Sequence, residues 1–85
     1  VLVTLTVPAA TSYKVIEVAA GGSKSNRAYL QIDGVSKYPI VYPANGMHGK
    51  IFSAFPTVEA GSVIRIISHS ASEGFHVAWI SVREV

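Results

Sequence analysis

The chain has 85 residues, the size of a single domain (1–85), and it contains no cysteine. A disulfide framework and a thiolate zinc site are therefore excluded, and the fold must be held by packing. Charged residues make up 14% of the sequence and the formal net charge is +2, while the mean hydropathy of +0.39 is high for a soluble domain of this size. We therefore expect apolar surface to be buried against another copy of the chain or its parent protein, and we expect no nucleic acid partner.

No run of residues approaches the ~20 apolar positions that cross a bilayer, so no membrane insertion is expected. The sequence starts at Val1 without a signal peptide or basic arm, which indicates a processed or excised piece.

Short runs of β-branched and aromatic residues, separated by Gly, Pro, Asn and Ser, predict an all-β protein. Their spacing favours an antiparallel β-sandwich, jelly-roll-like, with about seven to eight strands. Strands are predicted over residues 1–7, 13–20, 27–32, 38–42, 50–55, 63–69 and 75–85.

Turn signals lie between these strands, and one strand contains a proline. Gly21 and Gly22 are expected to reverse the chain at positive φ in a hairpin loop. Asp33 and Gly34 form the strongest short turn signal. Pro39 cannot donate a ladder hydrogen bond, so its strand is predicted to be an edge strand or a bulged one, and residues 43–49 are predicted to form a loop.

The last predicted strand is apolar on both faces. In a two-layer sandwich one face of a strand meets the core and the other meets water, so a second apolar face implies a second buried surface. We predict an oligomer interface through this strand. Phe75, Val77 and Trp79 lie on one face, and Ala78, Ile80 and Val82 lie on the other.

Four segments together carry a resemblance to known proteins: "LTVPAATSYKVIEVAAGG", "AYLQIDG", "FPTVEAGSVIRI" and "HVAWISV". Their order resembles the small jelly-roll domains of the C1q and tumour-necrosis-factor type, including similar tips of bacteriophage tail fibres. The resemblance implies a homotrimer with an apolar central seam, located at an extracellular or virion surface. It also implies loops at one end that bind a cell-surface glycan or a protein receptor.

The residues that could carry catalysis do not form a recognisable motif. There is no G-x-S-x-G nucleophile elbow and no phosphate-binding glycine pattern, so the chain is predicted not to be an enzyme and to need no cofactor. The carboxylates are single and far apart in the sequence and are expected to be solvated charges at turns and edges. They are Glu17, Asp33, Glu59, Glu73 and Glu84. The alternative is a pair brought together by folding, as glycoside hydrolases require.

The histidines His48, His69 and His76 lack metal-ligand spacing, and no metal site is predicted. In a trimer, His69 or His76 could still meet its symmetry mates on the axis and hold a metal ion or an anion.

One loop gathers residues suited to a ligand, because sugars stack on aromatic rings and hydrogen-bond to amides. Tyr38, Tyr42, Asn45 and His48 are the candidate ligand-binding residues. The alternative is that the two tyrosines cover a sheet edge and that Asn45 only forms a turn.

Trp79 is the single tryptophan and is interpreted as a core or interface anchor. If the last two strands were hairpin partners, Arg65 would lie opposite Trp79 and could form a cation–π contact. In a jelly roll these two strands belong to different sheets.

The sequence therefore predicts a non-catalytic receptor- or glycan-binding tip domain of a trimeric fibre. Two alternatives stay open: a structural trimerisation or capping module without a ligand, and a monomeric carbohydrate-binding module of a larger enzyme. The identity of the ligand is not determined by the sequence.

Overall fold

The chain folds as an antiparallel β-sandwich, as the sequence predicted. The computed structural model describes residues 2–54, 57–69 and 74–85. Among these residues no helix is long and apolar enough to cross a membrane. The strands are β1 (Val3–Thr6), β2 (Tyr13–Gly22), β3 (Asn26–Ile32), β4 (Val35–Tyr42), β5 (Gly46–Ile51), β6 (Val63–Ser68) and β7 (His76–Glu84).

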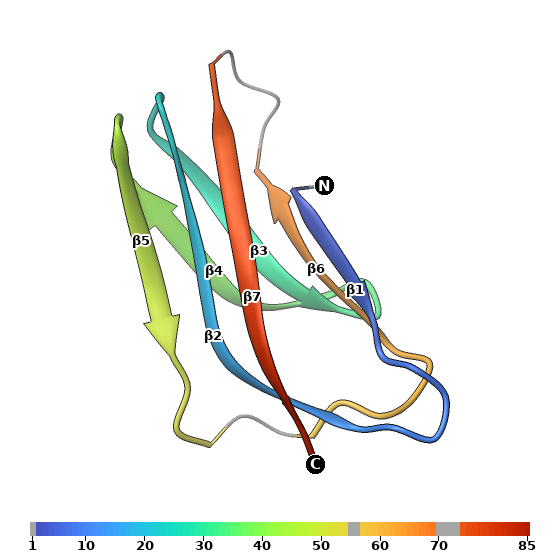
Figure 1. Cartoon of the computed structure of the whole chain (residues 1–85). Helices are drawn as coiled ribbons and strands as arrows, with labels where there is room; N and C mark the ends of the chain where they lie inside the picture. The colour runs from blue at the N-terminus through green and yellow to red at the C-terminus, as the bar shows by residue number, and fades with distance from the viewer. Residues whose placement is uncertain (1, 55–56, 70–73) are drawn as a thin grey trace.

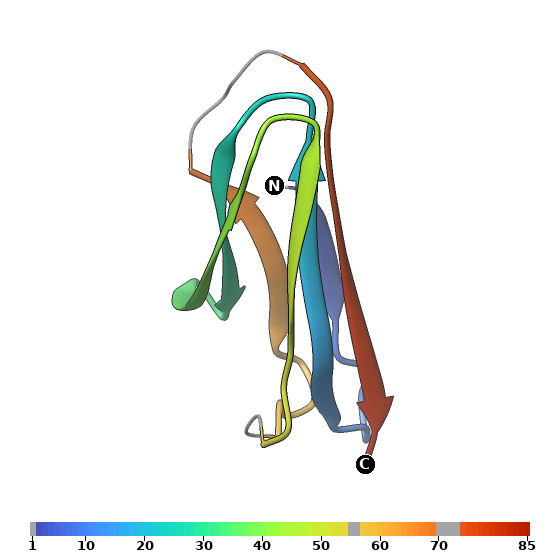
Figure 2. The same ribbon diagram turned by 90° about the vertical axis from the view of Figure 1, so that its left-hand side faces the viewer.

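The strands form two sheets that pack face to face (Figure 1). One sheet has four strands in the order β1-β6-β3-β4, and the other has three in the order β5-β2-β7. Figure 2 shows the two layers edge-on, with β3, β4 and β6 on one side and β2 and β7 on the other. The β3–β4 hairpin stays within one sheet, whereas the other connections between these strands cross from sheet to sheet.

The core is formed by every second side chain along the strands. In β3, Ala28 and Leu30 are fully buried while Arg27 is exposed, because successive side chains of a strand point to opposite faces. Both sheets contribute aliphatic side chains to the space between them, and no polar side chain of the described residues is fully buried. The core consists of Val7, Val15, Val18, Ala20, Ala28, Leu30, Ile40, Tyr42, Val58, Ile64 and Ile66.

Two local predictions are confirmed. Asp33 and Gly34 join β3 to β4 with φ values of 52° and 82°, the positive pair that a tight hairpin turn of this type requires. Pro39 lies in β4, which pairs with β3 and forms an edge of the four-stranded sheet. Its missing N–H therefore leaves the ladder intact.

The two glycines at the end of β2 were predicted wrongly. Gly21 and Gly22 continue the strand, and neither has a positive φ. The next strand lies in the opposite sheet, so no hairpin forms here. Gly21 instead permits close approach, because a Cβ at this position would lie 2.5 Å from Met47 Cγ and 2.6 Å from Gly46 O.

The predicted loop at residues 43–49 is shorter than expected, because β5 already begins at Gly46. The strand ends at Ile51, so the prediction of strand over residues 52–54 is wrong, and the predicted end at Phe55 lies outside the described residues. Arg65 and Trp79 are not neighbours in a ladder, since β6 and β7 belong to different sheets. Arg65 pairs with Thr4 and Gln31 instead.

Candidate functional site

The four predicted ligand-binding residues do not form one surface site. Tyr42 is 1% exposed and belongs to the core, so its ring is not available for stacking, which corrects the prediction. Tyr38 is half-buried and packs edge-on against Phe52, with 5.5 Å between ring centroids. Asn45 and His48 are exposed. Of the two aromatic residues of the predicted site, Tyr42 is therefore buried in the core and Tyr38 is half-buried against Phe52.

The Tyr42 hydroxyl has polar partners inside the sandwich. It lies 2.9 Å from Nδ1 of His76, and it also hydrogen-bonds to the Asn26 side chain. Burial raises the pKa of Tyr42, and the Asn26 hydrogen bond opposes this effect more weakly. The phenol therefore stays neutral, and its hydroxyl hydrogen-bonds to polar side chains that lie between the sheets.

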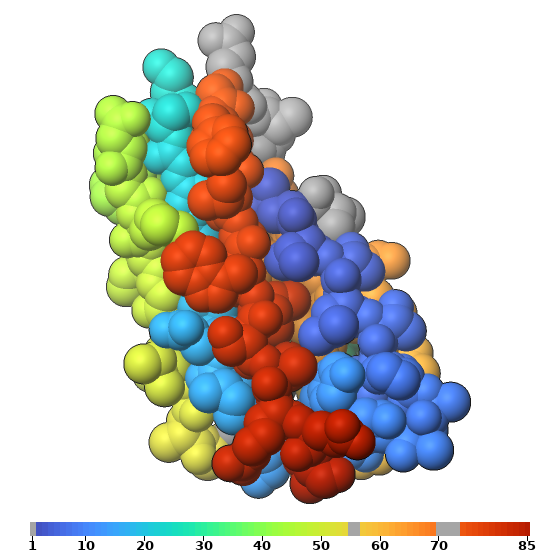
Figure 3. Space-filling model, viewed as in Figure 1, coloured from blue at the N-terminus to red at the C-terminus, as the bar shows by residue number. Residues whose placement is uncertain are grey.

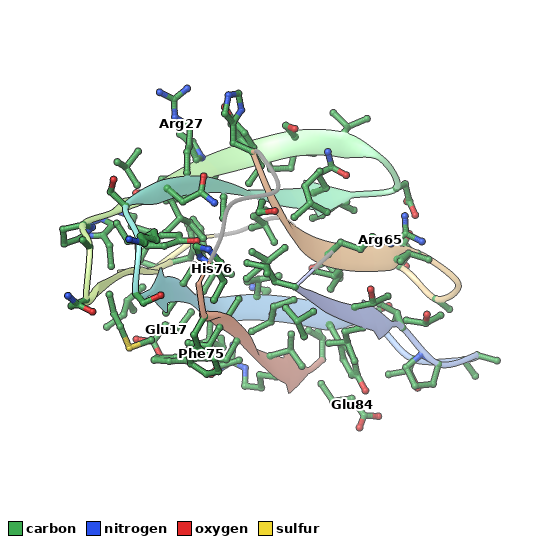
Figure 4. The ribbon with its side chains drawn as sticks, turned by 90° about the horizontal axis from the view of Figure 1, so that it is seen from above. Glu17, Arg27, Arg65, Phe75, His76 and Glu84 are labelled. Atoms are coloured by element: carbon green, nitrogen blue, oxygen red, sulfur yellow. The ribbon has the colours of Figure 1, made fainter. Side chains whose placement is uncertain are left out.

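The two histidines considered for a symmetry axis lie in different places. His76 lies between the two sheets (Figure 4) and uses Nδ1 for Tyr42. His69 is exposed at the end of β6, and its backbone N–H donates to the carbonyl of Arg27. Among residues 2–54, 57–69 and 74–85, no group of three His, Cys, Asp or Glu side chains is arranged to hold a metal ion.

Part of the outward side of the three-stranded sheet is apolar, and we call this part the apolar face; Glu17 borders it, opposite Ile51 in the ladder. Ile51 is 69% exposed, Phe75 is 67% exposed and Trp79 is 43% exposed. Figure 4 shows Phe75 on the side of this sheet that points away from the other sheet. The apolar face consists of Met47, Ile51, Phe75, Val77 and Trp79.

Small residues form the centre of the apolar face. The ladder places Trp79 opposite Ala19, which in turn lies opposite Gly49. Ala19 points outward and is nevertheless 4% exposed, because its small side chain lies between Trp79 on one side and the backbone of β5 at Gly49 on the other. Figure 3 shows this face, with β7 and β5 leaving little of β2 visible. The large side chains available for contact with a partner therefore come from the edges of the sheet, whereas the central strand β2 contributes a small residue.

No family model, curated protein or solved structure matches this chain. The likeness to C1q and tumour-necrosis-factor jelly rolls therefore stays a prediction.

The outward side of the four-stranded sheet carries a different set of side chains, which we call the basic face. Arg27 and Arg65 are exposed on it (Figure 4). This face was not predicted from the sequence, although the residues that alternate with the buried side of β3 could have indicated it. The basic face consists of Arg27, Tyr29, Gln31, Ser36, Pro39, Val41, Arg65, Ile67 and His69.

Two of the predicted isolated carboxylates lie at one end of the sandwich. Asp33 and Glu59 both line a hollow of about 460 Å³. Asp33 accepts hydrogen bonds from the Val63 N–H at 2.9 Å and the Ser62 hydroxyl at 2.8 Å, and Glu59 accepts one from Ser12 at 3.2 Å. The bonds of Asp33 connect the β3–β4 turn to the start of β6, and the bond between Ser12 and Glu59 joins two loops, so both carboxylates have an anchoring role. Glu73 lies outside the described residues.

The hydrogen bonds to Asp33 affect its titration. The bond from the Val63 N–H contributes most, the Ser62 hydroxyl contributes next, and together they hold the pKa of Asp33 below its usual value. The carboxylate is therefore ionised throughout the neutral range and anchors the β3–β4 turn to β6.

Proposed function

We propose that this chain is a non-catalytic assembly domain, which forms a homotrimer through its apolar face at the tip of an extracellular or virion fibre. The observation that carries the proposal is the concentration of exposed apolar side chains on one sheet. Among the residues that the structure describes, four of the seven large exposed hydrophobic residues belong to this face: Met47, Ile51, Phe75 and Trp79.

The size of the face supports association between copies. The two longer dimensions of the domain are 39 and 23 Å, so a whole side of the sandwich, of which the apolar face is a part, covers at most roughly 900 Å², and each partner buries ~800 Å² in a typical stable interface. Contiguous exposed apolar patches larger than a few hundred Å² mark interaction surfaces. In a symmetric homo-oligomer each copy covers the apolar face of a neighbouring copy, so every copy buries this face.

The free edge of β7 is a second reason to place the interface here. This strand has nine residues and no proline, and in the part of the chain that the structure describes its ladder partner is β2 alone. Two of the other three edges are blunted, since β1 has four residues and β4 contains Pro39, and the third, β5, is shorter than β7 with six residues. A long unprotected edge is the kind that pairs with or packs against another chain.

The jelly-roll form of the sandwich belongs to the same proposal. Connections that cross repeatedly between two sheets, with one hairpin inside a sheet, support it. A receptor- or glycan-binding role through Asn45 and His48 has weaker support than assembly, because Tyr42 lies in the core.

Light scattering tests the assembly with two matched charge insertions. Ile51→Lys places a cation on the apolar face, opposite Glu17 in the ladder, so the monomer gains a favourable cross-strand pair while the interface gains a charge. Val35→Lys makes the same change at another exposed residue, in β4 of the four-stranded sheet.

We expect the wild type and Val35→Lys to have about three times the chain mass of 9.0 kDa, and Ile51→Lys to have the monomer mass. A wild type that stays monomeric at all concentrations, or an Ile51→Lys variant that still associates, contradicts the proposal. A dimer mass contradicts the threefold arrangement.

A further inference from the structure

The basic face differs from the apolar face in charge. The strands of the four-stranded sheet contain Arg27, Lys37 and Arg65 and no Asp or Glu. The strands of the other sheet combine cations with Glu17 and Glu84. A face with cations and no carboxylate attracts an anionic partner.

Strand register arranges the side chains of the basic face in three rows. The middle row is apolar, and the rows on either side of it each contain one arginine and at least one further polar side chain. From one end of the sheet to the other the rows are His69, Arg27 and Val41, then Ile67, Tyr29 and Pro39, then Arg65, Gln31 and Ser36.

Tyr29 is held in position in the middle row. Its hydroxyl accepts a hydrogen bond from Nη1 of Arg27 at 3.3 Å, and its ring centroid lies 6.0 Å from that of His69. The side chain is partly exposed. An ordered, partly exposed aromatic ring can stack against the apolar C–H face of a sugar ring.

The two arginines lie on opposite sides of this ring. Arg27 and Gln31 are four residues apart on β3, which corresponds to about 13 Å along an extended strand, and Arg65 lies opposite Gln31. Arg27 donates one N–H to Tyr29, so four of the five guanidinium donors stay available. Beside Arg27 is a hollow of about 290 Å³, lined also by Ser25 and His69.

We propose that the basic face binds an anionic polysaccharide. A sugar ring would lie on Tyr29, and acidic groups on either side of it would meet Arg27 and Arg65. Guanidinium groups suit carboxylate and sulfate because they donate two parallel hydrogen bonds to one anion. The face points away from the apolar face, so this proposal does not depend on trimer formation.

Other macromolecules fit this face less well. The middle row offers three apolar residues, too few for the buried centre of a typical protein interface. A single-stranded nucleic acid would favour several stacking rings and a strongly basic groove, whereas the formal net charge is +2.

Binding can be measured with dextran sulfate, with uncharged dextran of the same length as the matched ligand control, and with oligothymidylate. Wild type and Ile51→Lys are both titrated, so that loss of assembly and loss of binding are read separately. We expect both proteins to bind dextran sulfate in preference to dextran and to oligothymidylate, with affinity falling as salt rises.

Three substitutions test the assigned residues. Arg27→Gln and Arg65→Gln should each weaken binding of dextran sulfate about tenfold, and the losses should add because the side chains are far apart. Tyr29→Leu should weaken it by about threefold to tenfold through loss of the stacking ring. Arg83→Gln, which removes the same charge from β7, should change it little.

Equal losses for Arg83→Gln and for the two basic-face arginines would mean that overall charge alone attracts the polyanion, which overturns the proposal. So would full retention of binding in Tyr29→Leu, or tighter binding of oligothymidylate than of dextran sulfate. Thermal unfolding followed by Trp79 fluorescence checks that each variant is folded.

Discussion

Tyr42→Phe tests whether this residue holds the two sheets together or serves a ligand. Tyr42 is 1% exposed, and its hydroxyl meets Nδ1 of His76 at 2.9 Å and the side chain of Asn26. Phenylalanine keeps the ring and removes the oxygen. The substitution therefore isolates the two hydrogen bonds from the packing of the ring.

The expected loss follows from the number of bonds. Each hydrogen bond contributes about 0.5–1.5 kcal/mol net, and the partners left behind lie partly within the sandwich, so we expect the free energy of unfolding to fall by about 2 kcal/mol. In a domain of this size that corresponds to a decrease in Tm of roughly 10 °C.

Urea unfolding followed by the fluorescence of Trp79, the single tryptophan, measures the change. All samples need the same protein concentration, because association adds to the apparent stability. Tyr29→Phe is the matched control, since its hydroxyl accepts one exposed hydrogen bond from Arg27, and we expect a change within about 0.5 kcal/mol. Equal effects in the two variants would refute the structural role of the Tyr42 hydroxyl.

Two further predictions concern the interface and the β3–β4 turn. Trp79 is 43% exposed, which leaves about 110 Å² of its surface to be covered on association. Sedimentation equilibrium should therefore show that Trp79→Ala weakens each contact between copies about a hundredfold. Unchanged association would exclude Trp79 as an interface anchor. The hydrogen-bonded Asp33 has a lowered pKa, so its contribution to stability is present above the unfolded value of about 3.9 and is lost as pH falls through the lower folded value. Tm measured from around pH 5 to around pH 3 should fall less in Asp33→Asn than in wild type, and parallel curves would contradict this role for Asp33.

Much of the fold could be predicted because it depends on local chemistry. Asp-Gly permits two successive positive φ values, and proline excludes β4 from the centre of a sheet. The two-sided apolarity of the last strand is also confirmed, since Ile80 packs against the core while Trp79 is exposed on the outward side.

The bulge in β2 illustrates where local reading becomes insufficient. The register shifts between Val15 and Glu17, so one extra residue interrupts the simple alternation of sides. Gly21 and Gly22 resemble a turn signal, yet β2 lies between β5 and β7 and needs small residues where the neighbouring strands approach closely. A reversal and a close contact both require glycine, and sequence alone does not distinguish them.

The residues that form the candidate surfaces also depend on both local pattern and tertiary contacts. The amino-acid pattern alone indicates which side chains share a face of a strand, because alternation is a property of the extended backbone. Tertiary structure decided which face meets the opposite sheet: it turned Tyr42 inward to His76, and it placed Arg27 beside His69 and Arg65 beside Gln31 on one outward surface. Those neighbours come from distant segments, and their contact is fixed by the pairing of strands across the sheet, which no local pattern encodes.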